Sequence, residues 1–261
     1  MTNNNDVTRV RSVSGVYFSW AGRLSSWGQI LLWCAATIAV VGMIWHPSLQ
    51  NWQYWNQVLV LEALLLAAYS LLTLGSSIAN FMARRKKIND VVDNAFGTEI
   101  GTEHSENYFD NEEIKEGTKK FLYNTAESCF FSYRELRSMA GGVCLKTFIP
   151  LAIMVVGLIV NKTEVIMAVF RISAIFVLVI QAVQYFVTLF QLEVLLSRML
   201  DTLKHKIGSA AQFNGESINY ALEYETVMVW YGVKIPDRVY LKLNEQFTSE
   251  WENLKTTFLV K

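Results

Sequence analysis

Polar side chains recur within an uncharged stretch that is long enough to cross a membrane. From Ala63 to Ala83 the sequence has 21 residues without a formal charge, which as a helix would be roughly 30 Å long, about the thickness of a bilayer's hydrocarbon core. Because polar groups in hydrocarbon need partners or water, their face is predicted to point into the protein or an aqueous path. On a helix, five polar-capable side chains share an arc of about 60°: Glu62, Tyr69, Thr73, Ser76 and Asn80.

A second polar face lies in the uncharged stretch from Ile172 to Leu192. Its members share an arc of about 80° on a helix: Ser173, Gln181, Gln184, Thr188 and Gln191. Two interpretations of these faces stay open. They are either hydrogen-bonded seams that hold a helix bundle together, or the lining of an ion pathway. Because four spans of this size enclose little space, a pore would need several copies of the chain.

Two ionisable side chains are expected about 8–9 Å below the outer membrane surface, at about 1.5 Å per residue: Glu62 and Arg171. A charge at that depth is costly unless it is paired or hydrated. One interpretation is an ion pair between them, and the other is a gating or selectivity ring at the outer mouth of a pathway. Since Arg171 lies roughly 80–160° from the polar face of its own helix, Glu62 is the side chain expected to face the pathway, where a ring of carboxylates would favour cations.

Catalytic and metal-binding patterns are missing from the sequence. The three histidines, His46, His104 and His205, lie in separate segments, and no nucleotide-binding glycine pattern or nucleophile elbow occurs. The three cysteines form no CxxC pair. We therefore expect a protein that is not an enzyme and that has no metal site and no cofactor.

The distribution of apolar residues predicts an all-α membrane protein with four transmembrane helices and a small helical cytoplasmic module. The chain has 261 residues, no net charge and 52% hydrophobic residues, and these gather in long uncharged blocks. The expected spans are Trp27–Trp45, Gln57–Ala83, Thr147–Val160 and Val165–Leu192. The third is short for a bilayer, so its helix could begin before Lys146, or the segment could be re-entrant or buried.

Basic residues predict the orientation. They precede the first span, follow the second as a run from Arg84 to Lys87, and follow the fourth, whereas the connection between the first two spans has none. Positive-inside logic places both termini in the cytoplasm. The resulting segments are 1–26 (amphipathic, cytoplasmic), 27–83 (first transmembrane hairpin), 84–145 (cytoplasmic insert), 146–192 (second hairpin) and 193–261 (cytoplasmic helical tail).

Periodicity gives more detail of the cytoplasmic parts. An amphipathic helix is predicted near FLYNTAESCFFSYREL. The tail is predicted to be helical, with breaks at Gly208, at Asn214–Gly215 and between Gly232 and Pro236. Its last helix has an apolar face at helical spacing: Val239, Leu243, Phe247, Trp251 and Leu254.

Two stretches carry a family resemblance. VYFSWAGRLSSWGQILLWCAATIAVVG, with Tyr17 and Ala21 a few positions apart, and ARRKKINDVVDNAFGTEI after the second span resemble the bacterial four-transmembrane, pore-forming antiphage effectors that are associated with nucleotide-second-messenger synthases. The two-plus-two span layout and the helical tail extend the likeness over nearly the whole chain, although the segment 105–145 departs from the expected pattern.

The resemblance implies a homo-oligomeric ion channel of the bacterial inner membrane that acts in antiviral defence. Its control would come from a nucleotide or oligonucleotide made by a partner nucleotidyltransferase. The alternative is a non-conducting membrane anchor or sensor that binds a cytoplasmic partner. An anionic nucleotide needs cations and stacking surfaces, which are clustered near the C-terminus in Trp230, Tyr231, Lys234, Arg238 and Lys242. The aromatic members could instead be core residues of the module.

Overall fold

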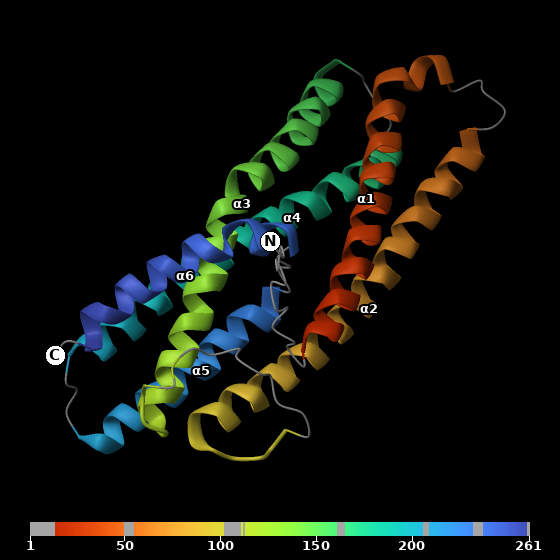
Figure 1. Cartoon of the computed structure of the whole chain (residues 1–261). Coiled ribbons are helices and arrows are strands. Elements are labelled where there is room, and N and C mark those ends of the chain that lie inside the picture. Colours follow the sequence, from red (N-terminus) through yellow and green to blue (C-terminus); the bar gives the residue numbers. More distant parts are fainter. Residues whose placement is uncertain are drawn as a thin grey trace, which may run out of the picture.

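The chain folds into helices. The computed structural model describes residues 14–49, 55–101, 111, 113–160, 165–205, 209–231 and 237–259, and within these ranges no strand occurs. This confirms the all-α prediction. The helices of the described chain (Figure 1) are α1 (Gly15–Leu49), α2 (Trp55–Phe96), α3 (Thr118–Val160), α4 (Val165–Lys204), α5 (Ala210–Tyr231) and α6 (Asp237–Leu259).

Two of the helices are long and apolar enough to cross a membrane. The qualifying stretches of the described chain are Asn56–Phe96 in α2 and Phe176–Lys204 in α4, a statement about their length and composition. At 42 residues, α2 would be about 63 Å long, roughly twice the thickness of a hydrocarbon core. A helix of that length must extend well beyond any bilayer that it crosses.

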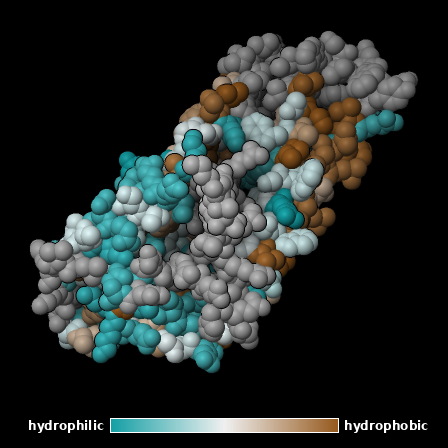
Figure 2. Space-filling model, in the orientation of Figure 1, coloured by the Kyte–Doolittle hydropathy of each residue, from teal (hydrophilic) through white to brown (hydrophobic). Residues whose placement is uncertain are grey.

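The molecule has two parts of different polarity. We call α1, the first half of α2, the end of α3 and the start of α4 the apolar arm, and the remainder of α2, α3 and α4 with α5 and α6 the helical module. In Figure 2 hydrophobic residues cover the arm along α1 and α2, whereas hydrophilic residues dominate the module. Several large exposed apolar side chains of α2, such as Leu64 and Leu71 (62% and 70% exposed), lie on the arm, whereas Ile88 and Phe96 are 39% and 40% exposed in the module.

Each part has its own core. The module core joins α3, α4, α5 and α6 and includes Leu122, Met199, Tyr224 and Trp251. The arm has a smaller cluster that joins α1, α2 and α4, with Ala35, Tyr69 and Leu178 among its members. The predicted apolar face of the last helix is confirmed at Phe247 and Trp251, which are buried, and Val239, Leu243 and Leu254 are partly buried.

Two predicted boundaries differ from the structure. The third predicted span, Thr147–Val160, is only the end of α3, which begins at Thr118 and includes the predicted amphipathic helix; the alternative in which this helix begins before Lys146 is the one observed. The predicted break at Asn214–Gly215 is wrong. These residues lie in the first turns of α5, where Ser209 caps the helix by accepting the Gln212 N–H (3.3 Å), so the helix is already nucleated there. The other predicted breaks, at Gly208 and between Gly232 and Pro236, lie outside the described residues.

Asp93 fixes the chain directly after α2. Its carboxylate accepts hydrogen bonds from Thr98 Oγ1 (2.7 Å), the Ile100 N–H (2.8 Å) and the Gly101 N–H (2.7 Å). Gly97 ends α2 with a φ of 64°, a left-handed conformation that favours glycine. These contacts fold residues 98–101 back onto the end of α2, and the Gly117 N–H, just before α3, donates to the Ala95 carbonyl of α2 (2.7 Å).

Candidate functional site

The polar face of α2 is mostly covered by the chain's own helices. Glu62, Tyr69, Ser76 and Asn80 are 4%, 9%, 0% and 6% exposed, respectively. Ser76 Oγ donates to the Ala21 carbonyl of α1 at 2.7 Å. The exception is Thr73, which is exposed. Five residues that share one arc of α2 therefore meet two different environments.

The polar face of α4 is divided in the same way. Gln181 links three helices, because its Nε2 donates to Tyr69 Oη (2.6 Å) and its Oε1 accepts from Gln29 Nε2 of α1 (3.2 Å). Thr188 is buried and donates to the Gln184 carbonyl (2.9 Å). Gln184 is half-buried and Gln191 is exposed, whereas the side chains of Ser173 and Arg171 lie outside the described part.

A buried charged junction joins the arm to the module. Of the basic run after Ala83, Arg84 is 5% exposed and its Nη1 lies 3.4 Å from Glu225 Oε2 of α5. The Lys86 ammonium lies over the Tyr17 ring of α1, 5.0 Å from its centre, and the Lys87 ammonium lies 5.6 Å from the centre of the Tyr224 ring. This run was expected to mark the cytoplasmic end of the second span, and of its four residues only Arg85 is exposed.

Glu135 of α3 contributes a buried acid to this junction. It is 6% exposed, and burial raises the pKa of its carboxyl to about 7, although the Lys87 ammonium acts in the opposite direction. Tyr224 Oη shares a 3.0 Å hydrogen bond with Ser132 Oγ on the same face of α3. The junction thus contains an acid whose ionisation falls in the physiological pH range.

A network of amides and a lysine closes the far end of the module. Asn111 Nδ2 donates to Asn124 Oδ1 (2.8 Å), and Asn124 Nδ2 donates to Asn94 Oδ1 (2.8 Å). Lys255 of α6 is 5% exposed, and its Nζ lies 2.8 Å from Glu113 Oε1. These contacts tie α2, α3 and α6 to the segment before α3, which is a structural role.

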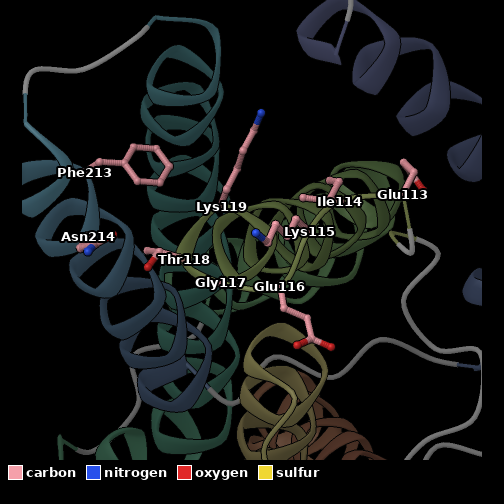
Figure 3. A pocket seen from close by; sticks show the side chains of 9 residues that line it. All are labelled: Glu113, Ile114, Lys115, Glu116, Gly117, Thr118, Lys119, Phe213 and Asn214. Carbon is pink, nitrogen blue, oxygen red and sulfur yellow. The ribbon is translucent and has the colours of Figure 1, made fainter.

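A shallow hollow of about 480 Å³ lies at the start of α3. Figure 3 shows Lys119 and Phe213 extending on one side of the helix start, whereas Glu116 points the other way, towards α2. Glu113 is paired with Lys255. The remaining lining residues include Lys115, Gly117, Thr118 and Asn214.

Most of the predicted ligand-binding residues have side chains outside the part of the chain that the structure describes. The side chains of Trp230, Tyr231, Lys234 and Arg238 are not described, and Lys242 is exposed on α6. Among the residues that are described, no group of three His, Cys, Asp or Glu side chains is placed to hold a metal ion.

Sequence reasoning missed two features. It used the run from Arg84 to Lys87 only to set the orientation and did not predict a buried junction, although the presence of Glu135 in the aromatic-rich stretch 129–136 was a signal for one. It also grouped Thr73 with Ser76 and overlooked Ser70 and Ser77, which are exposed beside Thr73.

Comparison with known proteins gives no match of this chain to a family model, a curated protein or a solved structure.

Proposed function

We propose that the chain is a four-span protein of the bacterial inner membrane with both termini in the cytoplasm. The apolar arm would lie in the bilayer and the helical module beneath it. Support comes from the apolar stretches in α2 and α4 and from the large exposed apolar side chains that gather on the arm. The absence of Lys and Arg between the first two spans favours this orientation.

Its function, we propose, is that of a homo-oligomeric ion channel and pore-forming effector of antiviral defence. The observation that carries this proposal is that α2 and α4 continue unbroken from the arm into the module. Arg84 of α2 and Met199 of α4 are buried in the module, while both helices expose apolar faces on the arm. A shift of α5 that breaks the Arg84–Glu225 contact would therefore act directly on a membrane helix, as in helix-shift gating.

The signal would be a nucleotide or oligonucleotide made by a partner nucleotidyltransferase, as the family resemblance implies. The ligand-binding residues remain those proposed from sequence: Trp230, Tyr231, Lys234, Arg238 and Lys242. Charge reversal at Arg238 and Lys242 should abolish nucleotide binding and leave membrane insertion intact. Charge reversal at Lys115 and Lys119, in the hollow of Figure 3, is the matched control. If only this control variant loses nucleotide binding, the ligand site is the hollow and not the C-terminal patch.

Flux through reconstituted liposomes tests the channel. Vesicles that are loaded with dye or ions and carry the purified protein should release their contents. Addition of a cyclic or linear oligonucleotide should either start this release or stop it. A non-hydrolysable ligand and a protein-free vesicle serve as controls. Absence of flux under every ligand condition would contradict the channel proposal.

A non-conducting anchor or sensor is the second candidate. The observation in its favour is the burial of Glu62, Tyr69, Ser76 and Asn80 within a single copy, since polar residues that hold helices together need no aqueous path. The channel proposal requires that the remaining polar positions, above all Thr73 and Gln191, meet water between copies. Glu62 and Arg171 would then act at the outer mouth as a pair that gating rearranges.

A further inference from the structure

One exposed face of α1 carries an arginine between two tryptophans. At about 100° per residue, Trp20, Arg23, Trp27 and Ile30 fall within an arc of about 80°. All four are exposed, with Trp20, Trp27 and Ile30 at 59%, 63% and 51%. Aromatic rings and long basic side chains on one face of a membrane helix are typical of the layer where hydrocarbon meets the lipid headgroups.

The packing of α1 on α2 gives the level of this face. Ser76 Oγ donates to the Ala21 carbonyl at 2.7 Å, so Arg23, two residues further along α1, lies at about the level of Ser76. The predicted span on α2 continues from Ser76 to Ala83, which is about 10 Å further towards the module. A hydrocarbon core that ended at Ala83 would therefore place Arg23 about 10 Å inside it, where a charge without a partner is costly.

The helices of the arm offer Arg23 no acidic partner. α1 has no Asp or Glu, and neither do the stretches 139–160 and 165–192. The first half of α2 has only Glu62, which is 4% exposed and lies about 21 Å along the helix from Ser76. A second copy of the arm brings the same residues and no further carboxylate. The phosphate of a lipid headgroup is the anion that remains to pair with an exposed arginine at this place.

The end of α5 gives an independent reason to end the hydrocarbon core before Ala83. α5 is antiparallel to α2 (Figure 1), because Glu225 contacts Arg84 whereas Ala221, one turn earlier, packs on a later turn of α2. α5 ends at Tyr231, about 9 Å closer to the arm than Glu225. Its last turn is open to the surroundings at Val229, which is 45% exposed. Because the last carbonyls of a helix need partners that hydrocarbon cannot supply, this end must lie outside the core.

We propose that the inner boundary of the hydrocarbon core lies at the level of Arg23 and Ser76, and that Arg23 binds the headgroups of anionic lipids there. Trp20 and Trp27 then lie one turn to either side of this boundary, in the interfacial layer. The inference rests on the proposed function, because it uses the membrane placement of the arm. It adds where the bilayer ends on the arm and which class of lipid the arm binds.

This boundary fits the thickness of a bilayer. From Gln57 to Ser76 α2 is roughly 30 Å long, which equals the hydrocarbon core, whereas from Gln57 to Ala83 it is about 40 Å long. Phe81, which is 56% exposed, falls in the interfacial layer, about 7 Å below the boundary. Arg84 lies about 12 Å below the boundary, so it can pack against α5 without entering hydrocarbon.

Nitroxide labels on α2 test the position of the boundary. Ser70→Cys and Ser77→Cys, at exposed positions, are labelled in a chain with Cys34→Ser and Cys144→Ser, in vesicles of phosphatidylcholine and phosphatidylglycerol. Relative accessibility to oxygen and to a water-soluble nickel chelate gives the depth of each label. The Ser77 label should lie within about 3 Å of the boundary and the Ser70 label about 10 Å deeper. A Ser77 label about 9 Å inside the core would place the boundary at Ala83 and overturn the inference.

Substitution of Arg23 tests the headgroup contact. Arg23→Gln should lower the preference for phosphatidylglycerol over phosphatidylcholine about fivefold, measured by native mass spectrometry of lipid-bound protein. Arg23→Lys should keep the preference, and Lys115→Gln, which removes an exposed charge at the far end of the module, should not change it. Wild-type preference in Arg23→Gln would overturn the headgroup contact. A change of oligomeric state in this variant without a change of lipid preference would assign the face to a second copy and overturn it as well.

Failure of the membrane placement itself has a separate signature. A label at Thr248→Cys, an exposed position of α6, reports the accessibility of a site in water. If the Ser70 label is as accessible to the nickel chelate as this one, the arm does not lie in the bilayer, and the proposed function fails together with the inference. If the Ser70 label is protected and the Ser77 label is deep, only the inference fails.

Discussion

Arg84 and Arg85 are consecutive and chemically identical, yet α2 places one inside the protein and the other at its surface. Arg84 faces α5 and pairs with Glu225 at 3.4 Å. Its guanidinium also lies over the Phe18 ring, 6.0 Å from the centre. A buried cation that loses its partner is costly, whereas an exposed one is solvated by water. The two residues therefore allow a matched comparison within one helix turn.

We expect Arg84→Gln to lower the free energy of unfolding of the module by about 2–4 kcal/mol, since it leaves the partly buried Glu225 carboxylate without its cation. Arg85→Gln should change it by less than about 0.5 kcal/mol. The measurement is denaturant-dependent labelling of Cys129 in a chain with Cys34→Ser and Cys144→Ser. A double-mutant cycle with Glu225→Gln gives the coupling between the two side chains, and equal effects of the two arginine changes would contradict the burial of Arg84.

Glu135 should make the stability of the module depend on pH. Because burial raises the pKa of this acid from 4.5 to about 7, the folded state binds more protons than the unfolded state between these values, and stability falls as the pH rises through this window. The loss is up to about 3.5 kcal/mol, from about 1.4 kcal/mol per unit of pKa. Glu135→Gln should flatten the profile between about pH 4.5 and pH 7 in the same labelling assay. An unchanged profile in this variant would assign the pH dependence to another group.

At the scale of elements, α2 presents different faces to different surroundings. One face packs on α1 through Ser76 and on α4 through Tyr69 and Gln181. A neighbouring face, with Thr73, is exposed. Such a helix both packs against its neighbours and forms part of the surface. Substitutions three residues apart on α2 should therefore differ in whether they change stability or ion flux.

Thr73→Leu and Ser76→Leu separate these two roles. Thr73→Leu should leave folding and assembly intact and block ion flux, because an apolar side chain replaces a hydroxyl near the middle of the proposed path. Ser76→Leu should destabilise the α1–α2 pair by about 2–3 kcal/mol, since it removes the bond to the Ala21 carbonyl and adds volume at a fully buried site. Thermal unfolding in detergent and liposome flux measure the two effects. Normal flux in Thr73→Leu would place the pathway elsewhere.

Gln181 holds α4 to α1 and α2, so its loss should weaken the arm. Gln181→Leu should cost about 0.5–1.5 kcal/mol, the range found for hydrogen bonds between membrane helices. Gln191→Leu, at an exposed position of the same helix, is the control for stability. A double-mutant cycle with Tyr69→Phe measures the bond itself, and zero coupling would show that the 2.6 Å contact contributes nothing to stability.

At the scale of the whole molecule, the arm and the module are joined through continuous helices rather than a flexible linker. In Figure 1, α2, α3 and α4 each extend through both parts. Each part also has a separate core. This architecture lets a structural change in the module reach the helices of the arm through rigid segments.

Topology is the prediction at this scale. Reporter fusions after residues 50, 110 and 261 should give an extracytoplasmic signal only at residue 50. Basic residues lie next to the predicted spans on the side of residues 110 and 261 and are absent from the connection that contains residue 50. A cytoplasmic signal at 50, or an extracytoplasmic signal at 110 or 261, would contradict the four-span arrangement with both termini inside.

The sequence by itself determined the all-helical class, the membrane-length apolar stretches of α2 and α4, and the buried face of α6 at Phe247 and Trp251. These are local properties, since hydropathy is summed along the chain and helical period sets the direction of each side chain around its own axis. Tertiary structure decided what lies in that direction. Thr73 and Ser76 belong to one predicted arc, yet Ser76 is fully buried against α1 whereas Thr73 is exposed, and Arg84 meets Glu225 of α5 and Phe18 of α1 whereas Arg85 is exposed. Neighbours of this kind come from residues more than fifty positions away, and no periodicity within a single helix specifies them.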